Sequence, residues 1–162
     1  MKAVVIETNI LIAANQKTEQ ASPECVLACV SALEEAKQKR ITLIDSGMRI
    51  FDEYRRHASF SGQPGLGDGF FKWLWVNQAH PKHCMRVDIT PKDDDSEDFN
   101  EFPNDPELES FDRSDRKFVA VARASKHKTK VVNASDTDWW HHREALRRHG
   151  VEVLFLCPDL MA

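Results

Sequence analysis

The chain has 162 residues, of which 41% are hydrophobic and 30% are charged, and this composition is sufficient for one packed core. It excludes a disordered or collagen-like protein. No stretch approaches the ~18 to 20 consecutive apolar residues of a membrane helix, and the first residues lack the apolar region of a secretory signal. Four cysteines are too few for a disulfide scaffold in a chain of this length. We therefore expect one domain over residues 1–162, in a reducing, cytoplasmic location, without membrane contact.

The net charge of −4 argues against a nucleic-acid partner, but the acidic residues are unevenly distributed. Ten of the 26 acidic residues lie in residues 93–112, a segment that contains no lysine or arginine. The rest of the chain carries 22 basic and 16 acidic residues, a net charge of +6. With an acidic segment that looks detachable, the remaining surface is compatible with a polyanionic substrate.

Short apolar runs alternate with segments of helical periodicity. The runs predict strands at residues 3–6, 41–44, 85–89, 129–132 and 151–156. The periodic segments predict helices at residues 22–39, 48–57, 70–76, 112–125 and 138–149. Irregular excursions are expected near residues 58–69 and 90–111, where glycines, prolines and charges interrupt the pattern. This order predicts an α/β fold, a Rossmann-like α/β/α sandwich whose mostly parallel central sheet has about five strands.

In such a sheet, ligands bind beyond the carboxyl ends of the strands, so acidic residues at those positions are of interest. Glu7 directly follows the first predicted strand, although a capping role for the next helix explains it equally well. Asp136 and Asp138 follow the fourth predicted strand. Helix capping explains Asp138 well and Asp136 less well, because a second capping acid is not needed.

Two further carboxylates lie on predicted helices. Positions 112, 115, 119 and 122 share one helical face, and Asp115 extends its apolar seam, which favours a cleft. Asp112 is better explained as the cap of that helix. Glu53 lies one turn after Ile50, and a surface ion pair is the slightly better interpretation from its spacing alone.

Carboxylates that converge from separate strand ends and helix starts repel one another unless a cation lies between them. Oxygen ligands suit Mg²⁺ or Mn²⁺, which can activate water and neutralise charge on a phosphoryl group. Phosphodiester hydrolysis is therefore the reaction that these residues favour.

Residues 4–11, Val-Val-Ile-Glu-Thr-Asn-Ile-Leu, resemble the opening of PIN-domain ribonucleases, in which a hydrophobic strand is followed by Asp-Thr-Asn. Glu53 occupies the place of the helix glutamate of that family. Residues 115–122 resemble its third acidic helix, and residues 133–139 resemble the loop after its fourth strand. The four pieces occur in the right order and span most of the chain.

The resemblance implies a PIN-like, metal-dependent ribonuclease of single-stranded RNA, acting as a toxin or an RNA-processing component. Glu7, Glu53, Asp115 and Asp136 would be catalytic and hold Mg²⁺ or Mn²⁺, and the supporting residues would be Asn9, Asp112 and Asp138. The expected partners are single-stranded or structured RNA, an antitoxin or other protein, and a second copy in a homodimer. Two residues depart from the family: Glu7 replaces the usual aspartate, and Ala134 stands where a hydroxyl residue is common.

Basic residues near these acids are candidates for contact with the sugar-phosphate backbone, although solvated helix surface explains each one better singly. They are Arg55, Arg56, Arg116, Lys117 and Arg143. The glycine-rich residues 62–69 lack the lysine of a phosphate-binding loop, so a lid or turn is the better interpretation.

Two other classes of protein are alternatives to a ribonuclease. The replacement at Glu7 favours a non-catalytic PIN-like module that binds RNA and has a weakened metal site. A response-regulator receiver domain would need an aspartate after the third strand and a lysine after the fifth. Thr90-Pro91 and Cys157-Pro158 stand there instead, which disfavours that class.

Overall fold

A computed structural model describes residues 2–93 and 95–161. Over these residues the main sheet has five strands in the order β3-β2-β1-β6-β7, and every pair of neighbours is parallel. The strands are β1 (Ala3–Ile6), β2 (Ile41–Asp45), β3 (Cys84–Val87), β6 (Thr129–Asn133) and β7 (Glu152–Phe155). The predicted α/β fold with a parallel five-stranded sheet is confirmed. All residues of β1 and β2 are buried, as their continuous apolar runs require.

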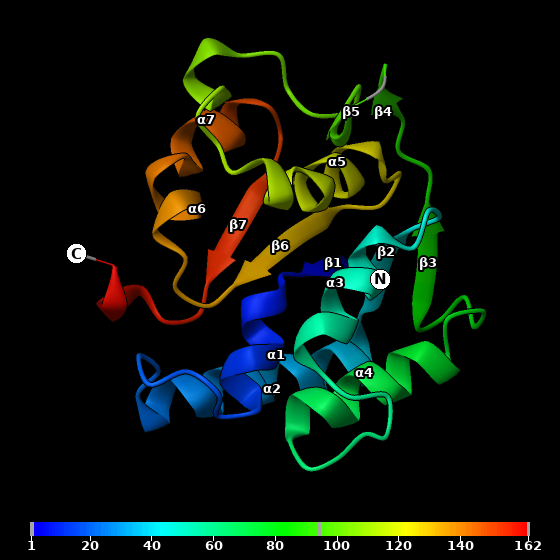
Figure 1. Cartoon of the computed structure of the whole chain (residues 1–162), viewed down its shortest axis with the longest axis vertical. Coiled ribbons are helices and arrows are strands. Elements are labelled where there is room, and N and C mark those ends of the chain that lie inside the picture. Colours follow the sequence, from blue (N-terminus) through cyan, green and yellow to red (C-terminus); the bar gives the residue numbers. More distant parts are fainter. Residues whose placement is uncertain (1, 94, 162) are drawn as a thin grey trace.

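Helices flank this sheet. They are α1 (Thr8–Ala14), α2 (Pro23–Lys39), α3 (Arg49–His57), α4 (Leu66–Val76), α5 (Arg116–Ala124), α6 (Thr137–His141) and α7 (Arg143–Arg148). In Figure 1, α1 to α4 gather in the lower half of the molecule, and α5 to α7 lie in the upper half. α5 packs against β1, β2 and β6, and α1 packs against α2, α3 and α4. The first residue after β1 therefore lies where both groups of helices meet.

Side-chain caps start two of the helices. The Ser22 hydroxyl accepts the backbone N–H of Cys25 at 3.1 Å, and Pro23 occupies the first turn of α2. The buried Asp45 carboxylate accepts the N–H groups of Arg49 and Ile50 at 3.0 and 2.9 Å. Asp45 thereby starts α3 at the carboxyl end of β2, and α3 begins at the edge of the sheet where ligands bind.

The excursion predicted at residues 58–69 is wrong in its last part, because α4 already begins at Leu66. Glycine in the first turn of α4 serves close packing. A Cβ atom on Gly67 would lie 2.3 Å from the carbonyl oxygen of Leu11 in α1. The buried Asp68 carboxylate accepts the N–H groups of Gly65 and Ser59, which fixes the turn before α4.

The acidic segment is part of the fold and is not detachable, contrary to the sequence-based prediction. It contains β5 (Asp95–Phe99), which pairs antiparallel with β4 (Pro91–Lys92) directly before the segment, and the short 3₁₀ helix η1 (Pro106–Leu108). Asp94 lies outside the described residues. Four apolar side chains of the segment are buried: Phe99, Phe102, Leu108 and Phe111. The high charge of the segment obscures these side chains in the sequence pattern.

Three helical predictions also need correction. α1 was not among the predicted helices, since five of its seven residues are buried and it has no polar face. The helix predicted from residue 112 begins as a 3₁₀ turn, η2 (Arg113–Asp115), before α5. The helix predicted over residues 138–149 is divided into α6 and α7 at His142.

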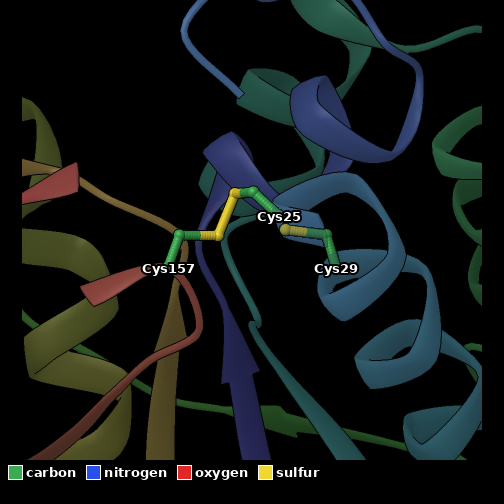
Figure 2. A group of neighbouring side chains, drawn as sticks. All are labelled: Cys25, Cys29 and Cys157. Atoms are coloured by element: carbon green, nitrogen blue, oxygen red, sulfur yellow. A yellow bond between two sulfur atoms is a disulfide. The ribbon is translucent and has the colours of Figure 1, made fainter. Parts of the chain in front are cut away.

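Cys25 and Cys157 form a disulfide with a Cα–Cα distance of 5.4 Å (Figure 2). The cysteines form no disulfide scaffold among the described residues, but this single crosslink was not predicted from the sequence. Its partners are 132 residues apart, so sequence spacing carries no sign of the pair. Among the described residues, no helix combines the length and apolar character needed to cross a membrane.

Candidate functional site

Three acidic side chains from distant parts of the chain meet at the carboxyl edge of the sheet. Glu7 follows β1, Glu53 lies on α3, and Asp115 ends η2 directly before α5. A carboxylate oxygen from each lies within 4.8 Å of the other two, a separation suited to ligands of one ion. All three residues are among the ligands predicted from the sequence. Their convergence depends on the strand order, which brings the ends of β1 and β2 side by side.

The cluster is buried and electrostatically strained. Glu7 is 5% exposed and Asp115 is 6% exposed. Burial, followed by the charges of Asp115 and Glu53, raises the pKa of Glu7 well above its usual range. Burial, followed chiefly by the charge of Asp136, raises the pKa of Asp115 to about 7. Both shifts mean that all three carboxylates are ionised together at neutral pH only when a cation is bound between them.

Neighbouring polar groups hold Glu53 in place. The ammonium of Lys117 lies 2.7 Å from Glu53 Oε1, and the hydroxyl of Thr8 donates to Oε2. Glu7 accepts only a weaker contact, from the N–H of Asn9 at 3.2 Å. Thr8 was not predicted as a site residue. Its position next to Glu7 was the only available signal.

Asp136 lies beside the cluster and outside its 4.8 Å group. It is the N-cap of α6 and accepts the N–H of Asp138 at 2.9 Å. Burial is the main cause that raises the pKa of Asp136. Its charge also raises the pKa of Glu7 and Asp115, so it contributes to the same negative field.

The supporting residues connect the loops around the cluster. Asn9 accepts the N–H of Ala134 at 3.0 Å and donates to Asn133 Oδ1 at 3.3 Å, joining the start of α1 to the loop after β6. Asp112 caps η2 through the N–H of Ser114, as predicted. Asp138 does not cap α6, because that helix begins one residue earlier. Its carboxylate accepts the N–H of Asp112 at 2.9 Å instead.

A basic hollow of about 190 Å³ adjoins the cluster at Glu53. Four cationic side chains line it: Arg49, Arg56, Arg113 and Lys117. Acidic side chains also lie on its wall, namely Asp52 and Glu97. Two of the four cations, Arg49 and Arg113, were not predicted: each is the first residue of a helix, α3 or η2, and its spacing gave no signal.

The other predicted RNA-binding residues lie in different surroundings. Arg116 is buried and forms an ion pair with Asp98 at 3.1 Å, so its guanidinium stabilises the fold. Arg55 lies over the ring of Phe60, with 4.7 Å between the guanidinium carbon and the ring centroid. Arg143 lies over the ring of Trp140 at 3.8 Å. Among the predicted five, only Arg56 and Lys117 line the hollow beside the cluster.

The donor set fits a divalent cation that prefers oxygen ligands. The three groups are carboxylates, and two of them are almost inaccessible to water, so mutual repulsion is poorly screened. Lys117 supplies one positive charge against three negative ones. Mg²⁺ and Mn²⁺ match this chemistry through Glu7, Glu53 and Asp115.

Comparison with known proteins found no counterpart: no family model, no curated protein and no solved structure matches the chain.

Proposed function

We propose that this protein is a metal-dependent endoribonuclease that hydrolyses phosphodiester bonds of single-stranded RNA. The observation that carries the proposal is the meeting of Glu7, Glu53 and Asp115 within 4.8 Å at the ligand-binding edge of a parallel sheet. The resemblance of residues 4–11, 115–122 and 133–139 to PIN-domain ribonucleases supports the choice of RNA. The resemblance also implies a protein partner, either an antitoxin or a second copy of the chain.

Each part of the site has a chemical task in this proposal. The bound ion supplies an activated water nucleophile and neutralises charge on the phosphoryl group. Thr8 and Lys117 orient Glu53 so that both of its oxygens are fixed. Arg56, exposed on α3, offers positive charge for a phosphate that flanks the scissile bond. Asp136 adds negative charge that favours retention of the cation.

A second candidate function rests on the position of Lys117. Its ammonium contacts Glu53 and partly neutralises the cluster without a metal. That contact favours a module that binds RNA through the basic hollow and does not cleave it. Both functions predict salt-sensitive RNA binding. Only the first predicts metal-dependent cleavage of the RNA, so the presence of cleavage products distinguishes them.

The test is cleavage of an end-labelled single-stranded RNA with Mn²⁺, with Mg²⁺, or with a chelator. We expect cleavage with either ion and none with the chelator. D115N and E53Q should each lower the rate at saturating RNA at least about 100-fold, since each removes a charged ligand. E144Q is the control, because Glu144 is exposed on α7 and pairs with Arg147. Binding without metal-dependent product would favour the second candidate, and full activity of D115N would refute the assignment of the site.

A further inference from the structure

Three cysteine sulfurs meet where the start of α2 contacts the segment after β7 (Figure 2). Cys25 and Cys157 form the disulfide, and Cys29 keeps a thiol. All three residues are buried, and their Sγ atoms lie within 4.8 Å of one another. The disulfide accounts for two of these sulfurs and leaves the position of the third unexplained.

The arrangement has the dimensions of a thiolate metal site. Cys25 and Cys29 are four residues apart in α2, so they project from the same face of one rigid helix. Sulfur ligands at about 2.3 Å from one Zn²⁺ lie about 3.8 Å apart in tetrahedral geometry. The Cys29 sulfur lies within 4.8 Å of the other two, and reduction frees the bonded sulfurs of Cys25 and Cys157 to separate to that spacing by rotation of their side chains.

We propose that the reduced chain binds one Zn²⁺ ion through Cys25, Cys29 and Cys157. A dithiol reductant passes two electrons and two protons to the disulfide and becomes a disulfide itself, which leaves thiols on Cys25 and Cys157. The ion then displaces one proton from each of the three thiols, and the complex carries a net charge of −1. Water takes the fourth position, reached from a hollow of about 500 Å³ that Cys25 helps to line.

The donor atoms decide which ion is bound. Thiolates are soft ligands that select Zn²⁺ over Mg²⁺ and Mn²⁺. Among the described residues, the cysteine group offers sulfur ligands only, whereas the other cluster offers carboxylate oxygens. The two sites are therefore chemically distinct. Burial raises the pKa of Cys29 to about 11, so a metal-free Cys29 stays protonated at neutral pH. Coordination reverses this state, because a thiol bound to zinc is deprotonated.

The ion would replace the disulfide as the crosslink between α2 and the end of the chain. The backbone N–H of Cys157 donates to the carbonyl of Ala134 at 3.0 Å, in the loop that leads to Asp136. Both crosslinks therefore fasten α2 to the segment after β7, which is hydrogen-bonded to that loop beside the carboxylate cluster. One is suited to oxidising conditions and the other to reducing conditions.

The test uses the full chain, reduced with a phosphine so that no thiol reagent competes for metal, and titrated with Zn²⁺ and with Co²⁺. C29A removes one ligand, and C84A is the matched control because Cys84 is another buried free thiol. We expect native mass spectrometry to show one tightly bound Zn²⁺ in the wild type and in C84A. We expect C29A to bind that ion at least about tenfold more weakly, since it retains two thiolates.

Co²⁺ distinguishes the cysteine group from the carboxylates, because only thiolate ligands give a sulfur-to-cobalt charge-transfer band. We expect this band in the reduced wild type and C84A, and its loss in the oxidised wild type. Circular dichroism checks that C29A remains folded, and C157A provides an independent two-thiolate variant. The proposal is overturned if the reduced wild type gives no such band, or if C29A and C157A both bind Zn²⁺ as tightly as C84A.

Discussion

The charge of Glu53 is compensated locally, whereas that of Glu7 is not. Lys117 and Thr8 both contact Glu53, while Glu7 receives one backbone N–H, that of Asn9. Burial, and after it the charges of neighbouring carboxylates, raise the pKa of Glu7 and of Asp115. A divalent ion would relieve the repulsion at the two carboxylates that the protein leaves least compensated.

Asp115 gives the metal-free chain a pH-dependent stability. Its pKa is about 7 in the folded chain and 3.8 when unperturbed, so the folded state favours the protonated form. This stabilisation is full below pH 3.8 and is lost as the pH rises through about 7. D115N does not titrate, so we expect it to be more stable than the wild type at pH 8, by up to about 4 kcal/mol. Urea unfolding with a chelator at pH 5 and pH 8 measures the difference.

The advantage of D115N should be smaller at pH 5 than at pH 8, and saturating Mn²⁺ should reduce it at pH 8 by stabilising only the wild type. D159N is the matched control, since Asp159 is exposed. A D115N variant that is less stable than the wild type at pH 8 without metal would contradict this account of the cluster.

At the scale of elements, the sequence predicts what local chemistry determines. The buried strands follow from β-branched runs, and the starts of α2 and α3 follow from capping by Ser22 and Asp45. The order of strands then places Glu7, Glu53 and Asp115 at one edge, which makes these candidates accessible to sequence reasoning. Asp136 was predicted for the same reason, and it lies at the margin of the cluster because it also caps α6.

Features that depend on contacts between distant segments could not be predicted. The acidic segment is held by Phe99 and Phe102, whose burial is not evident among so many charges. The partners of Glu53, Thr8 and Lys117, are 45 and 64 residues away from it in the chain. The pairing of Cys25 with Cys157 joins opposite ends of the chain in the same way. Local periodicity contains no information on any of these contacts.

Arg116 is the main polar link between the acidic segment and α5. Its guanidinium pairs with Asp98 at 3.1 Å and donates to the carbonyl of Glu109 at 3.0 Å. R116M keeps much of the side-chain volume and leaves these acceptors without their cation. We expect a loss of about 3 kcal/mol in the free energy of unfolding, as is typical when one partner of a buried ion pair is removed. Urea denaturation of R116M measures this loss.

R147M is the control for that experiment, because Arg147 is 69% exposed in its pair with Glu144 and an exposed pair contributes little. A stability of R116M equal to that of R147M would mean that Arg116 does not hold the acidic segment to α5, and that the buried aromatic side chains and the contact of Arg123 with the Glu101 carbonyl do so instead.

The distribution of charge over the whole molecule decides whether a chain with net charge −4 can bind a polyanion. Four cationic side chains surround the hollow beside Glu53, and the acidic segment contributes Glu97 to the same wall. The hollow carries four cations against three carboxylates, so RNA would meet a small local excess of positive charge within a globally acidic protein. At physiological salt, where charges more than about 8 Å apart are largely screened, the local field dominates.

The affinity for RNA should accordingly depend on salt through these few cations. Arg56 is exposed on α3 and lines the hollow, so R56M removes one phosphate contact. For single-stranded nucleic acid, each such contact contributes about 0.7 to the slope of log affinity against log salt concentration. We expect R56M, in a D115N background that leaves the RNA intact, to lower the magnitude of that slope by about 0.7, with R147M unchanged. Fluorescence anisotropy over a series of salt concentrations measures the slope, and equal slopes for R56M and R147M would place the RNA path elsewhere, because total charge changes equally in both variants.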